Sequence, residues 1–182
     1  MLDAAVRVFS RRGYHAAAVD EIAELAGISK PMVYAYLGTK EELFVACLHR
    51  EGTRLMEAVA ASAGVPDPDE RPGRRLCRGL EAFFGFVAAH RDAWSVLHRQ
   101  ARGQEPFAGV IARMRAQWIE IVIGVLAEAV PDAGDVTPAA YALVGAVESL
   151  ADWIAEHGTD DADPQATAAH LADLILRGLR PL

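Results

Sequence analysis

Residues 29–40 read SKPMVYAYLGTK and bring two lysines and two tyrosines onto one short segment. Ammonium and phenol groups both donate hydrogen bonds, so the segment carries donors suited to anionic oxygens. Packing alone would favour leucine and alanine on so short a helix, so Met32, Tyr34 and Tyr36 indicate contact with a partner. The pattern alone leaves one alternative open, an ordinary helical corner with two partly exposed tyrosines.

The sequence contains no comparable group of residues that could catalyse a reaction or bind a metal. Cys47 and Cys77 are thirty residues apart with no CxxC pair, which predicts two reduced, mostly buried thiols. His90 and His98 are eight residues apart, too far along one helix to share a metal, and the other histidines are scattered. No glycine-rich phosphate loop follows a strand, and no serine or cysteine stands in a nucleophile motif. The sequence therefore predicts no enzyme, no metal site and no cofactor.

Charge is divided unevenly along the 182 residues. Residues 1–50 hold six basic and six acidic side chains, so the net charge of −7 lies in residues 51–182. An anionic polymer is therefore repelled less by the first fifty residues. With 52% hydrophobic residues the chain can bury a core, yet it has no apolar run long enough to cross a membrane and no signal-peptide pattern. These features predict a globular, cytoplasmic protein with no membrane partner.

Apolar residues recur at helical spacing nearly throughout, and no segment alternates convincingly with period two, which predicts an all-α fold. We expect the first helix to start at Leu2 and stop at Gly13. A second helix ends at Gly27. The side chains expected to face inward from the second helix are Ile22, Ala23, Leu25 and Ala26.

Capping residues locate the next two helices. Ser29 is expected to cap a third helix, with Pro31 in its first turn and its end near Leu37. Thr39 and Glu42 have the spacing of a capping box, which predicts that a fourth helix starts there and continues to about residue 63.

Residues 64–73 contain three prolines and form the clearest loop. The helices expected beyond it bring the total to about nine; they are Arg74–His90, Ala93–Ala101, Pro106–Ala129, Pro138–Glu156 and Pro164–Gly178.

The second and third helices and the turn between them form a helix-turn-helix. The string VDEIAELAGISKPMVYAYLGTKEELF, with LDAAVRVFSRRGY before it, resembles the DNA-binding domain of the Tet repressor (TetR) family of bacterial transcriptional regulators. The resemblance covers residues 2 to about 50. It implies a three-helix DNA-binding domain over residues 1–45 and a larger helical domain for ligand binding and dimerisation over residues 46–182.

The resemblance also implies roles for individual residues. Tyr34 and Lys40 match positions that hold DNA phosphates, and their donor groups suit that role. Lys30 and its neighbours match positions that face the major groove, where a lysine can bond a guanine edge. The predicted DNA-binding residues are Ser29, Lys30, Pro31, Met32, Tyr34, Ala35, Tyr36 and Lys40. The chain departs from the family at Ala18, where most members have a capping Ser or Thr, and at Pro31, Met32 and Leu37.

Similarity to the family is weaker beyond residue 51, although its general plan fits. An apolar pocket is predicted to be lined by Phe83, Phe84, Val87, Trp94, His98, Phe107, Ile111, Met114, Gln117, Trp118 and Tyr141, although many of these can equally be core residues. The predicted dimer interface consists of Leu143, Val147, Leu150, Ile154, Leu171, Leu174 and Ile175, on two helices suited to a four-helix bundle. Packing within one chain is the alternative for each stripe.

Together these features predict a ligand-responsive, DNA-binding transcriptional regulator. We expect it to bind double-stranded DNA at a palindromic operator as a homodimer and to repress transcription until a small apolar or aromatic effector releases it. The alternative is a helical small-molecule-binding protein with no DNA-binding activity.

Overall fold

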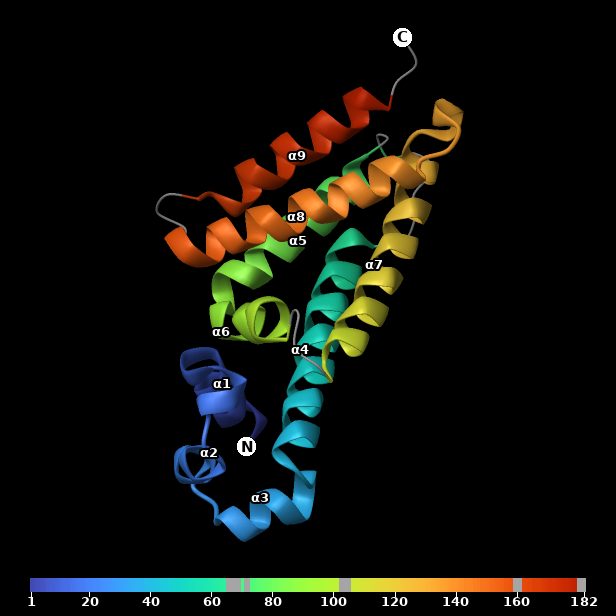
Figure 1. Cartoon of the computed structure of the whole chain (residues 1–182). Helices are drawn as coiled ribbons and strands as arrows, with labels where there is room; N and C mark the ends of the chain where they lie inside the picture. The colour runs from blue at the N-terminus through green and yellow to red at the C-terminus, as the bar shows by residue number, and fades with distance from the viewer. Residues whose placement is uncertain (65–69, 71–72, 102–105, 159–161, 180–182) are drawn as a thin grey trace. The chain divides into compact units, whose positions relative to one another are not determined.

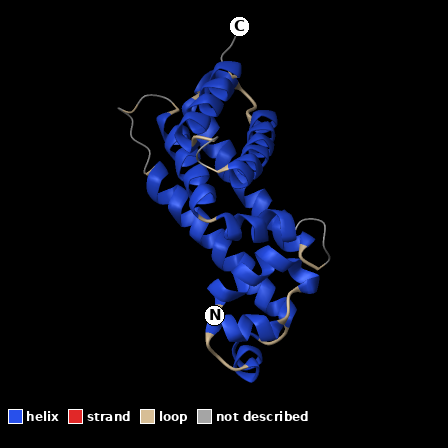
Figure 2. Ribbon diagram, turned by 90° about the vertical axis from the view of Figure 1, so that its left-hand side faces the viewer, coloured by secondary structure: helices blue, strands red, loops and turns tan. Residues whose placement is uncertain are grey.

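The computed structural model describes residues 1–64, 70, 73–101, 106–158 and 162–179. Every regular element within those ranges is a helix, as Figure 2 shows, so the all-α prediction is confirmed. The N-terminal helices of Figure 1 are α1 (Leu2–Ala16), α2 (Val19–Ala26), α3 (Lys30–Leu37) and α4 (Lys40–Ala63). The elements that follow are α5 (Arg74–Ala89), α6 (Arg91–Trp94), the π-helix η1 (Ser95–Gln100), α7 (Ala108–Ala129), the 3₁₀ turn η2 (Pro131–Ala133), α8 (Thr137–His157) and α9 (Pro164–Gly178).

The chain divides into two compact units. The first consists of Met1–Arg54 and His90–Arg113, and the second of Leu55–Ala89 and Met114–Leu182. The predicted domain bounds, 1–45 and 46–182, stay a prediction.

An aromatic cluster forms the core of the first unit. Phe44 of α4 lies edge-on to Phe9 of α1, with ring centroids 4.9 Å apart, and is 4.5 Å from Phe107. Tyr14 closes the group at 5.1 Å from Phe44 and 4.7 Å from Phe107. Phe9, Phe44 and Phe107 are fully buried. The cluster thus joins residues near the N-terminus to a residue that precedes α7.

Gly13 interrupts α1 as the sequence predicts, although one further turn follows it. Its backbone (φ 75°, ψ 163°) lies in a region that only glycine adopts readily, and it kinks the helix before Tyr14. A β-carbon at Gly13 would lie 3.1 Å from Oε1 of Gln100, because η1 packs against α1. Ser10 adds a second tie between α1 and this segment by donating a 2.8 Å hydrogen bond to Asp92 of α6.

In the second unit, α5 packs against α8 and α9, which also contact each other. Ion pairs add connections from α7, since Arg75 lies 2.6 Å from Glu128 and Arg115 lies 2.9 Å from Glu148. The largest fully buried side chains here include Phe84, Leu126, Leu143 and Ile154.

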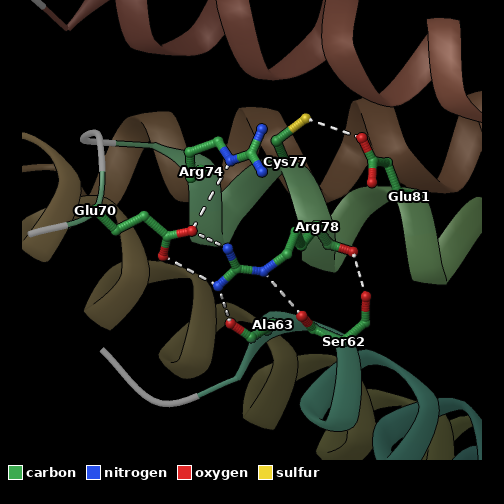
Figure 3. A network of polar contacts seen from close by, with 7 residues as sticks. All are labelled: Ser62, Ala63, Glu70, Arg74, Cys77, Arg78 and Glu81. Atoms are coloured by element: carbon green, nitrogen blue, oxygen red, sulfur yellow. Dashed lines mark hydrogen bonds and ion pairs between the residues drawn. The ribbon is translucent and has the colours of Figure 1, made fainter. Parts of the chain in front are cut away.

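Arg78 of α5 caps the C-terminus of α4 (Figure 3). Its guanidinium donates to the carbonyl of Ser62 at 3.0 Å and to that of Ala63 at 2.7 Å, and it also pairs with Glu70. These carbonyls lie in the last turn of α4, where no intrahelical donor is available. The cation therefore satisfies the helix end and fixes α5 against it.

The predicted helix over Ala93–Ala101 is wrong in detail. The structure has one turn of α6 and then the π-helix η1, whose wider spacing cannot be distinguished from α-helical spacing over six residues. Among the described residues, no helix is long and apolar enough to cross a membrane.

Candidate nucleic-acid interface

The turn between α2 and α3 is built on Gly27. Its left-handed backbone (φ 67°, ψ 29°) ends α2, and its N–H donates to the carbonyls of Ala23 and Glu24. The N–H of Ile28 also donates to Ala23, at 3.0 Å, so the chain reverses within two residues. Such a turn holds α3 in a fixed orientation on α2.

Leu25 was predicted to face inward, and that prediction is wrong, because its side chain is 47% exposed. The buried face of α2 is formed by Val19, Ile22 and Ala23. At about 100° per residue, Leu25 lies roughly 110° from the centre of that face, on the solvent side.

The start of α3 explains why Ser29 does not act as a side-chain cap. Ser29 occupies the N-cap position with an extended backbone, as predicted, but its hydroxyl accepts no hydrogen bond from the helix. Pro31, in the second helical position, has no N–H to donate. The next N–H, on Met32, donates instead to the carbonyl of Ser29 at 3.0 Å. The serine hydroxyl at the tip of the motif is therefore not used by the helix.

The outer face of α3 carries the side chains that the sequence predicted for it. Tyr36 is 71% exposed, Tyr34 44% and Met32 42%, whereas Val33 is 2% exposed and holds the helix inward. The remaining predicted contact residues of this segment are also exposed; they are Ser29, Lys30, Pro31 and Ala35. One short helix thus presents a continuous surface of aromatic, flexible and basic groups.

The first turn of α4 contains the predicted capping box. The N–H of Thr39 donates to the Glu42 carboxylate at 2.7 Å, and the N–H of Glu42 donates to the Thr39 hydroxyl at 3.1 Å. The hydrogen bonds from Thr39, the backbone one first, lower the pKa of the Glu42 carboxyl below its usual value. The box fixes Lys40, the first residue of α4, next to α3.

Lys40 is held by α1. Its ammonium donates to the carbonyl of His15 at 3.0 Å and lies 5.0 Å from the ring centroid of Tyr14. Partial burial lowers the pKa of the Lys40 ammonium, and burial followed by the nearby Glu41 raises the pKa of the Tyr14 phenol. Sequence reasoning did not find these partners, because they lie some twenty-five residues away in the chain.

Lys30 also has a partner that no local sequence pattern indicates. Its ammonium donates to Asp20 of α2 at 2.9 Å. That hydrogen bond, more than the charge itself, raises the pKa of Lys30. The ten-residue separation follows no helical period, so no local pattern pointed to the pair.

Two stretches of the chain match one protein family. Residues 1–47 match "Bacterial regulatory proteins, tetR family", and residues 72–178 match "Tetracyclin repressor-like, C-terminal domain". The chain belongs to the TetR family of bacterial transcriptional regulators. It is thus a DNA-binding transcriptional regulator, and the alternative of a binding protein without DNA is not favoured.

Proteins with similar sequences or structures are transcriptional regulators as well. The chain is 36% identical to the transcriptional activator FasR of Mycolicibacterium smegmatis over 58% of this chain and 47% of FasR, so it spans about half the length of that relative. It is 29% identical to the transcriptional repressor NicS of Pseudomonas putida over 99% of this chain and 91% of NicS. In a crystal structure of a TetR-like regulator from Rhodococcus sp. RHA1, the protein is 45% identical in sequence to this chain. The two structures superpose with a TM-score of 0.84, covering 98% of this chain and 92% of that one.

The residues predicted to line a pocket in this TetR-family chain fall in both units. In the first unit, Trp94 and His98 are buried and stacked with ring centroids 4.7 Å apart, Phe107 belongs to the aromatic cluster, and Ile111 is half-buried. In the second unit, the ring of Phe83 lies 5.7 Å from Phe84 and 5.9 Å from the half-buried Trp118. The others there are Val87, which is buried, Met114, which is half-buried, and Gln117 and Tyr141, which are exposed. The pocket stays a prediction.

Most of the residues predicted for the dimer interface are buried or half-buried within the single chain. Leu143, Val147, Ile154 and Leu171 are buried, Leu150 and Ile175 are half-buried, and Leu174 is 69% exposed. A second row of residues on α8 is more exposed to solvent: Gly145 is half-buried, Ser149 is exposed, and Trp153 is 38% exposed. The sequence contained the signal for it, because these residues recur every four positions.

Proposed function

We propose that this TetR-family regulator represses transcription by binding a palindromic operator as a homodimer. The observation that supports it best is the outer face of α3, where Met32, Tyr34 and Tyr36 are exposed and only Val33 of the helix is buried. Exposed side chains of this kind contribute little to folding, whereas they can contact base edges and phosphates in the major groove. Such a regulator works where the chromosome is, in the cytoplasm.

The contact residues that we propose have distinct roles. Tyr34 and Lys40 hold phosphates, while Lys30, Pro31, Met32, Ala35 and Tyr36 face base edges and Ser29 stands at the tip of the motif. A phenol and an ammonium suit phosphate oxygens, and the methyl and methylene groups of Met32 and Pro31 suit thymine methyls. Phosphate contacts supply affinity for any sequence, and base contacts supply the preference for one.

Dimerisation would use the outer face of α8 together with α9. Gly145 and Ser149 are small enough for a second helix to approach closely, and Trp153 on the same helix and Leu174 on α9 are exposed apolar side chains. Two copies related by a two-fold axis would form a four-helix bundle and present two α3 helices to half-sites about 34–36 Å apart, or a multiple of that. Leu174→Glu is expected to shift the protein to a monomer in sedimentation experiments, and an unchanged dimer would contradict this interface.

We also infer that a small apolar or aromatic effector releases the DNA. The aromatic side chains of α5 and α7, among them Phe83, Phe84 and Trp118, suit such a ligand better than a polar one. Because both α3 helices must bind together, a small change in their separation couples the ligand to the DNA. A screen of apolar, aromatic and highly polar compounds for release of a bound duplex tests this inference, and release only by the highly polar compounds would contradict it. We propose no catalytic activity for the chain.

Selection from a randomised duplex library tests the DNA-binding proposal. Wild-type protein is expected to enrich a palindrome, and Tyr36→Ala is expected to alter the enriched sequence without altering thermal stability, because the side chain is largely exposed. Leu25→Ala is the matched control, since it removes an exposed apolar side chain from the other helix of the motif. An identical enriched sequence from wild type and Tyr36→Ala would contradict the assignment of Tyr36 to the groove.

A further inference from the structure

Asp20 lies against the first basic residue of the recognition helix. It is the second residue of α2, and its carboxylate accepts a 2.9 Å hydrogen bond from Lys30, the first residue of α3. The two side chains are 68% and 45% exposed, so the pair stands in solvent rather than in the core. An exposed pair of this kind contributes little to folding stability. Its position at the proposed DNA interface calls for another explanation.

We infer that Asp20 is a specificity-determining residue that reserves Lys30 for base edges and keeps it from DNA phosphates. The inference rests on the proposed DNA interface. An ammonium group has three donors, so Lys30 can keep one bond to Asp20 while another reaches a guanine edge. Phosphates, in contrast, are repelled by the Asp20 carboxylate beside the ammonium. Since binding to non-operator DNA depends almost wholly on phosphate contacts, the carboxylate weakens that binding most.

A purely structural role for Asp20 has to be separated from this one. Ala18 provides no side-chain cap at the start of α2, and acidic residues in the first turn stabilise an uncapped helix end. Glu21 supplies the same charge in the same turn, but its partner is Arg12 of α1, at 3.5 Å, rather than a residue of α3. Glu21→Gln therefore reproduces the loss of helix-end charge without changing the environment of Lys30.

The experiment compares the affinity of full-length protein for the enriched operator and for a scrambled duplex over a range of salt concentrations. Asp20→Asn frees Lys30 to contact phosphate, so its binding to the scrambled duplex is expected to tighten about fivefold per subunit at ~0.15 M salt, with the salt slope about 0.9 per subunit steeper. Affinity for the operator is expected to change less, which lowers the specificity ratio. Asp20→Glu keeps the charge and is expected to keep most of the ratio.

Two variants test whether the effect passes through Lys30. Glu21→Gln is expected to leave the specificity ratio unchanged. In a Lys30→Gln background, Asp20→Asn is expected to have little further effect, because no ammonium remains to be freed. Thermal unfolding of each variant checks that the comparison is between folded proteins.

Three results would overturn the inference while leaving the proposed function intact. They are an equal change of operator and scrambled affinity in Asp20→Asn, the same loss of ratio in Glu21→Gln, and a full effect of Asp20→Asn in the absence of Lys30. Wild-type protein that prefers no duplex at all would overturn the proposed operator binding and, with it, this inference.

Discussion

Substitution of Lys40 by methionine separates two functions of one side chain. The methylene stem and its packing remain, but the ammonium that donates to His15 and lies over Tyr14 is lost. An exposed hydrogen bond contributes about 0.5–1.5 kcal/mol and an exposed cation–π contact about 0.5–1 kcal/mol. Because methionine keeps the apolar contact, we expect Lys40→Met to destabilise the folded protein by about 1 kcal/mol.

The expected effect on DNA binding is larger. Each phosphate contact contributes about 0.9 to the salt slope, which at ~0.15 M salt corresponds to roughly a factor of five in affinity. A dimer loses two such contacts, so Lys40→Met is expected to weaken binding about 30-fold and to reduce the slope by about 1.8. Since phosphates are common to all sequences, operator and scrambled duplexes are expected to weaken alike.

Fluorescence anisotropy of labelled duplexes, titrated between low and high salt, measures both quantities. Arg177→Met is the matched control, because it removes an exposed positive charge that pairs with Asp173 on α9, in the second unit. It is expected to change the slope little. An unchanged slope in Lys40→Met would refute the phosphate contact, and a loss confined to the operator would mean that Lys40 reads sequence instead.

Three further outcomes follow from the structure. Gly13→Ala is expected to lower the free energy of unfolding by about 1–3 kcal/mol, and Gly27→Ala, in the milder left-handed region, by about 1 kcal/mol. Denaturant titration measures both losses, and a larger loss for Gly27→Ala than for Gly13→Ala would contradict the greater backbone strain expected at Gly13. The lowered pKa of Glu42 means that its bonds to Thr39 stabilise the fold above about pH 4.5 and are lost as the pH falls further, so Glu42→Gln is expected to flatten the acid side of a stability–pH profile. Burial raises the pKa of the Cys47 thiol to about 12, so alkylation at pH 8, followed by mass spectrometry, is expected to be far slower in the folded than in the unfolded protein.

The sequence predicted those parts of the fold that depend on neighbouring residues. The capping box at Thr39 and Glu42 was found from a spacing of three, and α4 has the predicted bounds. The start of α9 follows from Asp163, whose carboxylate accepts the N–H of Gln165 at 2.9 Å beside the proline that follows it. Such signals involve residues within one turn of each other, so they can be identified without the rest of the structure.

The charge environment of the interface could not be predicted in the same way. The side chains on α3 could be assigned to an exposed face, because Val33 and the helical period determine which side is buried. The partners of Lys30 and Lys40 depend on how α1 and α2 lie against them, which no local spacing encodes. The same applies to α8, which carries the apolar stripe of Leu143 and Ile154 and a second row with Gly145, Ser149 and Trp153, and only the structure shows that Leu143 and Ile154 are buried in the chain while Trp153 is not.

Phe107 shows that the first unit is built from two separate stretches of the sequence, so no single boundary position can define it. It is fully buried against Phe44 and Tyr14, although the chain leaves this unit after Arg54 and returns only at His90. The core that α1 and α4 form beside the DNA-binding motif therefore includes Phe107, and Gly13 provides the close approach that lets η1 pack on α1. Because packed aromatic cores do not deform continuously, a displacement of Phe107 would have to be accommodated by Phe44 at the N-terminal end of α4. The elements that orient α3 are thus mechanically connected to a segment that lies outside the helix-turn-helix sequence.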